Sequence, residues 1–168
     1  MNDDILLRAM EPEDLDLLYK IENDQQLWNV GNTNVPYSRY VLHDYIANAT
    51  GDIYADQQVR LIVENGKGET VGVADLMNFD AKNLRAEVGI VIVREFRCQG
   101  YAVAALEKMA CYALQVLHLH QLYAVVDTDN EASLKLFRKA GYQAVSELRD
   151  WLYDGKKYHS ALLMQRFL

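Results

Sequence analysis

The loop over residues 97–102 could hold a phosphate group. It follows a β-branched run over residues 88–93 and precedes a long helical pattern that starts near Tyr101. Where a strand passes to a helix through a tight loop, several backbone N–H groups point the same way and the helix N-terminus adds partial positive charge. Gly100 would let the backbone approach a phosphate, and Ala102 would keep the helix close to the sheet. An ordinary strand-to-helix turn that contains glycine is the alternative interpretation.

A second group of side chains is spaced as on one face of a helix. Asn130, Ser133 and Phe137 follow one another at intervals of three and four residues, the separation that brings side chains together on a helix surface. Thr128 and Glu131 have the form of a capping box, with a hydroxyl for an early N–H and a glutamate three residues later. We therefore expect a helix that begins at Thr128 and ends at the next glycine.

Hydrophobic periodicity and turn signals predict the elements that position these residues. Strands are expected over residues 5–8, 59–64, 70–76, 84–93, 121–126, 142–151 and 157–168, and helices from residue 11, over 38–49, over 101–117 and from residue 128. Asn65 and the glycine after it give the strongest hairpin signal in the chain. The pattern predicts an α/β (α+β) fold in which a mixed, mostly antiparallel sheet of about seven strands carries helices on both faces.

Composition limits the classes of protein to which the chain can belong. A length of 168 residues, with 51% hydrophobic and 24% charged, is typical of a single soluble domain over residues 1–168. No apolar run approaches the ~20 residues of a membrane span, and the N-terminus lacks the pattern of a secretory signal. Cys98 and Cys111 show neither paired nor metal-type spacing, which favours the cytoplasm. The net charge of −7 argues against nucleic acid as a partner and favours a cationic substrate.

The two motifs together carry a family resemblance. The loop over residues 97–102 reads Arg-x-x-Gly-x-Ala after a strand, and residues 130–142 read Asn-x-x-Ser-x-x-x-Phe-x-x-x-Gly-Tyr. In this order they resemble the GCN5-related N-acetyltransferase (GNAT) superfamily, and the resemblance extends over essentially the whole chain. It is closest to the branch that holds the spermidine N-acetyltransferases and the ribosomal-protein alanine N-acetyltransferases.

The resemblance implies transfer of an acetyl group from acetyl-CoA to an amine in a ternary complex. No metal cofactor is expected. It also implies a sheet that is splayed between its fourth and fifth strands, so that the pantetheine arm can lie along the fourth strand. The implied cofactor-binding residues are Ile90, Val91, Ile92 and Val93 for the pantetheine arm, Arg97, Cys98, Gln99, Gly100, Tyr101 and Ala102 for the pyrophosphate, and Asn130, Ser133 and Phe137 near the thioester.

Glu87 is the candidate general base. An alkylamine with a pKa of about 10.4 is neutral in only about one molecule in a few thousand at pH 7, a handicap of roughly 4 to 5 kcal/mol that a base or a desolvating pocket must offset. Related enzymes place a glutamate at this position, where it acts on the amine directly or through water. The alternative is a solvent-facing glutamate paired with Arg85. A backbone N–H near Val91 is the expected donor to the oxyanion.

The sequence departs from its relatives where the leaving thiolate is protonated. Many members carry a tyrosine at the position of Phe137, which has no proton to donate, so the hydroxyl of Ser133 or a water becomes the candidate donor. A hydroxyl bonded to its own helix is the alternative for Ser133. In the loop, relatives commonly carry a cation where this chain has Cys98 and Gln99. The spacing of His118 and the next histidine does not indicate a metal site.

The acceptor is expected to be a small amine such as a polyamine, or the N-terminus of a peptide. Net acidity and Glu87 favour the polyamine, whereas the absence of acids at Asn34 and Val35, where polyamine enzymes carry them, weakens it. The serine of the second motif favours the peptide. A CoA-binding sensor without turnover is a third possibility. Aromatic residues expected near the acceptor are Trp28, Tyr37, Tyr40 and Tyr45, and a homo-oligomer interface could include Trp151 and Tyr153.

Overall fold

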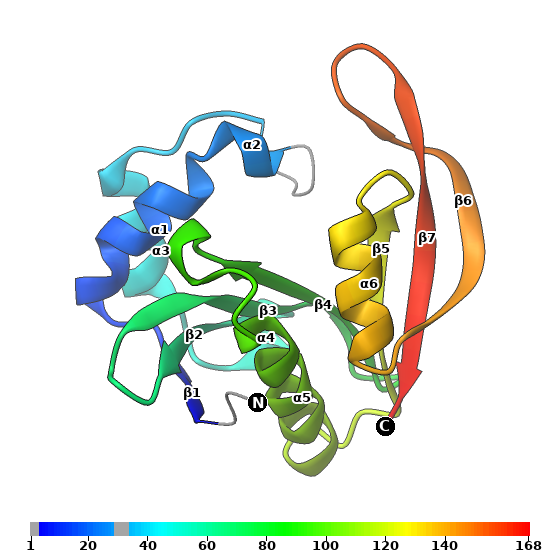
Figure 1. Cartoon of the computed structure of the whole chain (residues 1–168). Helices are drawn as coiled ribbons and strands as arrows, with labels where there is room; N and C mark the ends of the chain where they lie inside the picture. The colour runs from blue at the N-terminus through cyan, green and yellow to red at the C-terminus, as the bar shows by residue number, and fades with distance from the viewer. Residues whose placement is uncertain (1–3, 29–33) are drawn as a thin grey trace.

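The computed structural model describes residues 4–28 and 34–168 and has one seven-stranded sheet (Figure 1). The first three residues of the N-terminal segment considered above lie outside the described part. The strands are β1 (Ile5–Ala9), β2 (Val59–Asn65), β3 (Thr70–Asp80), β4 (Arg85–Ile92), β5 (Gln121–Asp127), β6 (Gln143–Tyr153) and β7 (Tyr158–Phe167). Their order across the sheet is β1-β2-β3-β4-β5-β7-β6. The pairs are antiparallel except β4 with β5, which is parallel.

Helices cover both faces of the sheet, as the sequence predicts. The helical elements are η1 (Pro12–Asp14), α1 (Leu15–Glu22), α2 (Gln25–Trp28), α3 (Arg39–Asn48), α4 (Ile53–Asp56), η2 (Arg94–Phe96), α5 (Tyr101–Gln115) and α6 (Glu131–Lys139). One core lies under α5 and α6, where Leu106 and Leu134 are buried. A second core joins α1 and α3 to the opposite face through Leu18 and Leu42.

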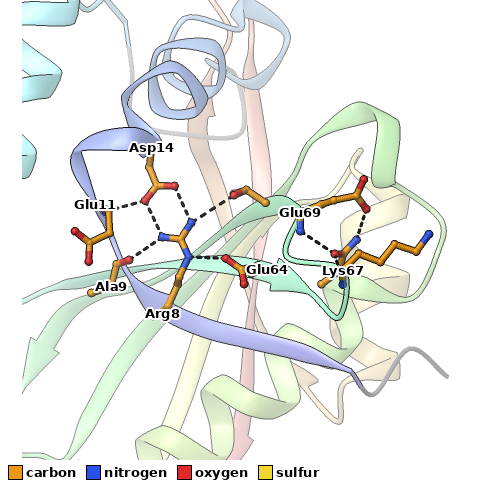
Figure 2. A network of polar contacts seen from close by, with 9 residues as sticks. Arg8, Ala9, Glu11, Asp14, Glu64, Lys67 and Glu69 are labelled. Atoms are coloured by element: carbon orange, nitrogen blue, oxygen red, sulfur yellow. Dashed lines mark hydrogen bonds and ion pairs between the residues drawn. The ribbon is translucent and has the colours of Figure 1, made fainter.

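The start of the chain is fixed to the sheet by an arginine. Arg8 on β1 donates to both carboxylate oxygens of Asp14 at 2.8 and 2.9 Å and to Glu64 on β2 at 2.8 Å (Figure 2). Asp14 in turn accepts from the backbone N–H of Glu11. Burial acts to raise the pKa of Asp14, but the bonds from Arg8 and Glu11 outweigh it and hold that pKa below its usual value. The network joins η1 to β1 and β2.

The predicted hairpin between β2 and β3 is present. The Asn65 side-chain oxygen accepts from the backbone N–H groups of Lys67 and Glu69, both at 3.0 Å (Figure 2). Gly68 takes the left-handed conformation in this turn, with φ 77°. An asparagine side chain that bonds its own turn is the reason that this residue type favours such positions.

The helix predicted to begin at Thr128 begins three residues later. Asn130 is the N-cap of α6, since its side-chain oxygen accepts from the backbone N–H of Ser133 at 3.1 Å. The Thr128 hydroxyl instead donates to the carbonyl of Ser160 on β7. The predicted capping box is therefore wrong. Asn and Thr are both good N-caps. Asn130 takes this position because the Thr128 hydroxyl is already bonded to β7.

The splay between β4 and β5 is confirmed. Their parallel pairing covers three residue pairs, from Arg85 with Gln121 to Glu87 with Tyr123. After Glu87 the two strands diverge, with β3 on one side and β7 on the other (Figure 1). Within residues 4–28 and 34–168, no strand pairs with the edge of β4 that faces β5 over residues 88–92, where an extended ligand could pair with it.

Candidate active site

Glu87 lies at the point where β4 and β5 separate. It is the last residue of β4 that pairs with β5, it stands opposite Tyr123, and its side chain is half-buried. The side-chain amide of Asn78 donates to Glu87 Oε2 at 2.7 Å. Arg85, the alternative partner considered for Glu87, forms its ion pair with Asp80 at 3.1 Å. The carboxylate is thus oriented by an amide rather than neutralised by an arginine.

Tyr123 borders this carboxylate from β5. Residues in register on adjacent parallel strands project to the same face, so the phenol and the Glu87 carboxylate share one side of the sheet. Burial raises the pKa of Tyr123, and the negative charge of Glu87 acts in the same direction. The phenol therefore keeps its proton through the neutral range. The sequence analysis did not identify Tyr123.

The loop between β4 and α5 has the form expected of an anion cradle. Cys98 and Gly100 both take positive φ, 61° and 90°, and Gly100 is the N-cap of the 15-residue helix α5. A Cβ on Gly100 would meet no atom within 4 Å, so within this chain the glycine is required by its left-handed backbone. Arg97 Nε donates to the carbonyl of Ile92 at 2.9 Å. This bond fixes the start of the loop against the end of β4.

A pocket lies between the end of β4 and the helices α1 and α2. Its volume is about 260 Å³. It brings together four of the residues predicted to bind the cofactor, Val91, Ile92, Val93 and Arg97, and adds residues that the sequence analysis did not select, namely Lys20, Ile21, Asp24, Leu27, Arg94 and Glu95. Ile90 instead packs against the core under α5. The pocket has both signs of charge along its rim.

The second motif lies at the start of α6, and its three residues are placed differently. Asn130 is used as the N-cap described above. Ser133 is half-buried, and no hydrogen bond of its hydroxyl is found within residues 4–28 and 34–168. Phe137 is only 5% exposed and packs edge-to-face on Tyr142, with ring centroids 5.1 Å apart. Phe137 is therefore a core residue, and Ser133 has a hydroxyl available for a ligand.

A buried ion network lies on the face covered by α1 and α3. Arg60 on β2 donates to both oxygens of Asp75 on β3, at 2.7 and 3.0 Å, and to Glu22 on α1 at 2.5 Å. The three side chains are only 12 to 20% exposed. Burial raises the pKa of Tyr45, the half-buried aromatic beside this network. The network carries one net negative charge and lies on the same face of the sheet as Glu87. Its signal in the sequence was Asp75, an aspartate in an otherwise apolar strand.

The other aromatic residues expected near the acceptor serve mainly local structure. Trp28 donates its indole N–H to the carbonyl of Glu22 at 2.9 Å. The backbone of Tyr37 is held by the side chain of Asn23. Tyr40 is 80% exposed on α3.

A histidine surrounded by aspartates joins the β6–β7 hairpin to the end of β5. His159 Nε2 lies 2.6 Å from Asp154, and its Nδ1 lies 3.1 Å from Asp129 and 3.7 Å from Asp127. The donor atoms of Asp127, Asp129 and His159 lie within 4.8 Å of one another, a spacing that could hold a metal ion. The expectation of no metal rested on other histidines and did not consider this group, because its members are distant in sequence.

Comparison with known proteins places this geometry in a family. Residues 4–143 match the acetyltransferase (GNAT) domain. Spermidine N(1)-acetyltransferase of Escherichia coli (strain K12) is 29% identical over 164 residues, which are 95% of this chain and 84% of the relative. Putative ribosomal N-acetyltransferase YdaF of Bacillus subtilis (strain 168) is 30% identical over 166 residues, 95% of this chain and 88% of the relative.

The fold agrees with solved structures. Spermidine N-acetyltransferase from Vibrio cholerae in complex with CoA and spermine gives a TM-score of 0.85 at 22% identity, and the match covers 99% of this chain and 96% of that one. The family domain spans most of the chain, and it includes the splayed strands and the loop before α5. The chain therefore belongs to the GNAT acetyltransferase family and is an acetyl-CoA-dependent N-acetyltransferase.

Proposed function

We propose that the acceptor is a small polycationic amine of the polyamine class, and that Glu87 is the base that takes its proton. The observation that carries the proposal is the position of Glu87, half-buried at the point where β4 and β5 separate and oriented by Asn78. Two relatives named spermidine N(1)-acetyltransferase, at 29% and 23% identity, support the substrate class. The net charge of −7 favours a cation in the same way.

The residues present fit the cosubstrate. The free edge of β4 and the residue after it, over residues 90–93, would pair with the pantetheine arm. The backbone of the loop over residues 97–102 would hold the pyrophosphate at the N-terminus of α5. Asn130 would contact the arm through its amide nitrogen, because its oxygen is used as the helix cap. When bound, acetyl-CoA supplies the acetyl group as a thioester.

Two side chains then share the acid–base chemistry, the carboxylate of Glu87 and the hydroxyl of Ser133. Glu87 would accept the ammonium proton, directly or through a water, so that the amine attacks as the neutral base. A backbone N–H near Val91, from a residue of β4 whose amide faces the splay, would donate to the developing oxyanion. Ser133 or a water would return a proton to the thiolate, because Phe137 lies in the core with no proton to donate.

The test is release of the CoA thiol from acetyl-CoA with purified protein and a panel of spermidine, spermine, lysine and N-terminal peptides. We expect turnover of the polyamines and a fall in kcat of about 100-fold or more in Glu87→Gln, in the range that a positioned base supplies. Asp80→Asn, at the nearby ion pair with Arg85, is the matched control and should retain activity. Equal turnover by wild type and Glu87→Gln would show that Glu87 is not the base.

Peptide N-terminal acetylation is the second candidate function. It is favoured by the 30% identity to the putative ribosomal N-acetyltransferase and by the available hydroxyl of Ser133. Turnover of peptides alone in the same panel would move the assignment to this class. Binding of acetyl-CoA without transfer to any amine would instead support the CoA-binding sensor.

We also propose that the protein is cytoplasmic and that copies of it self-associate through β6. Both cysteines are free and exposed, which suits a reducing compartment. No helix of the described residues is long and apolar enough to cross a membrane. Trp151 and Tyr153 on the edge strand β6 are 60% and 61% exposed, and a spermidine N-acetyltransferase from Vibrio cholerae is dodecameric. Light scattering of wild type and Trp151→Glu tests this surface.

A further inference from the structure

The strand beside Glu87 contains a β-bulge. On β3, Met77 stands opposite Glu87 and Asp80 stands opposite Arg85, so residues 78 and 79 together face the single residue Ala86. Asn78 takes a left-handed conformation with φ 48°. A bulge changes the direction in which a side chain projects from a strand, and bulges are frequent beside active sites. Asparagine tolerates left-handed φ better than most residues.

Core packing fixes the bulge on the face of the sheet opposite Glu87. Phe79 is 6% exposed and packs edge-to-face on Tyr54, with ring centroids 5.2 Å apart, and its backbone N–H donates to the carbonyl of Gln57. Asn78, the other bulge residue, is exposed and projects to the opposite side. There its amide donates to Glu87 Oε2 at 2.7 Å. Packing of one bulge residue therefore directs the amide of the other at the carboxylate.

The hydrogen bond has little to contribute to folding at this exposed position. An average hydrogen bond contributes only about 1 kcal/mol net, because it replaces hydrogen bonds to water. The Asn78 side chain is not part of either core. A bulge that directs an exposed amide at a candidate base rather than into the core indicates a functional role.

We propose that Asn78 is a positioning residue that holds the Glu87 carboxylate for proton transfer. The inference rests on the proposed function of Glu87 as the base. The amide fixes Oε2, and within the described residues Oε1 makes no hydrogen bond, which leaves it to accept the ammonium proton of the acceptor. Tyr123 closes the β5 side of the carboxylate. Burial raises the pKa of Tyr123, so its phenol stays protonated and does not compete as a base.

Two substitutions change the Asn78 amide while they keep the backbone of the bulge. Asn78→Asp keeps the shape and the tolerance of left-handed φ but replaces the donating N–H₂ with an acceptor, and Asn78→Gly keeps the backbone and removes the side chain. We expect both to lower kcat by about 10- to 100-fold, the loss that follows from a misplaced catalytic group. The KM for acetyl-CoA should stay within about twofold of wild type, because neither substitution changes a residue proposed to hold the cosubstrate.

Asn83→Asp is the matched control. Asn83 lies in the turn between β3 and β4, is exposed, and bonds Asp80 rather than Glu87. The same chemical change there should leave kcat unchanged. Unchanged kinetics in both Asn78 variants would overturn the proposal, and so would equal losses in the Asn83 variant.

A second measurement does not depend on turnover. The side-chain amide of Asn78, assigned with Asn78→Asp, is followed by nitrogen-15 NMR in wild type and Glu87→Ala. Loss of the carboxylate that accepts its hydrogen bond should move the signal of the bonded amide proton, and an unchanged signal would overturn the proposal. If no amine is acetylated but the signal moves, the proposed function fails while the contact from Asn78 to Glu87 is upheld.

Discussion

Gly72 on β3 has no space for a side chain beside β4. A Cβ built there would lie 2.1 Å from the carbonyl oxygen of Val91 and 3.0 Å from the Cα of Ile92. Both atoms belong to the backbone of β4, the strand proposed to pair with pantetheine. A side chain at residue 72 would therefore displace the cosubstrate-binding edge itself.

We predict that Gly72→Ala destabilises the protein by about 3 kcal/mol, because backbone atoms cannot move aside as a side chain can. Gly89→Ala is the control. Its Cβ would meet the flexible end of Met77 at 3.2 Å, so its loss should be about 1 kcal/mol or less. Denaturant unfolding of both variants measures the difference, and a Gly72→Ala protein as stable as Gly89→Ala would show that β3 and β4 can separate freely.

Single residues differ in how far the sequence could predict them. Glu87 and Ser133 were selected because family motifs mark their positions. Asn78 was not, because its role depends on a bulge whose register is set by the pairing of β3 with β4 and by burial of Phe79. Phe137 was expected near the thioester, and the structure shows that its ring packs on Tyr142.

At the scale of elements, the β6–β7 hairpin is attached to the end of β5 by His159. The hydrogen bond to Asp154 is the main reason that the pKa of His159 is raised above 6.5, and Asp129 and Asp127 act in the same direction. The pKa of Asp154 is lowered by the backbone N–H of Lys157 and by His159. The raised histidine contributes stability that is present below pH ~6.5 and is lost as the pH rises through its folded value. The lowered aspartate contributes stability that is lost only in acid.

We predict that the hairpin opens more readily at pH 9 than at pH 6. Amide hydrogen exchange, corrected for the intrinsic effect of pH, should show protection over residues 150–160 falling between these values in wild type. His159→Gln should show the lower protection at both pH values. His43→Gln, on the exposed face of α3, should behave as wild type, and a pH effect that persists in His159→Gln would assign it to other groups.

Element boundaries were predicted well where a strand or helix carries its own signal. The hairpin at Asn65, the strands β4 and β5 and the start of α5 follow from alternation and turn residues. β3 extends to Asp80, four residues beyond the predicted end, because the bulge lets it continue pairing with β4. The start of α6 was misplaced because Thr128 bonds β7, a contact between distant segments.

At the scale of the whole molecule, the sheet divides into two arms. The strands β1 to β4 form one arm and β5 to β7 the other, and within the described residues they pair only over residues 85–87 with 121–123. The predicted cosubstrate residues lie on both sides, on β4 and the loop before α5 in one arm and at the start of α6 in the other (Figure 1). The fold class and the splay between the fourth and fifth strands could be anticipated from the family motifs, whereas the order of the strands and the extent of the narrow junction follow from strand lengths and register.

We predict that CoA stabilises the two arms as a unit. A ligand present at 100 times its Kd adds about 2.7 kcal/mol, so the melting temperature should rise, and amide exchange should slow at residues 88–92 and at the start of α6. Adenosine 3′,5′-bisphosphate, which lacks the pantetheine arm, is the control. It should protect the loop over residues 97–102 but leave α6 unchanged, because only pantetheine extends along the splay. Equal protection of α6 by both ligands would mean that the arms are coupled through the core rather than through the bound cosubstrate.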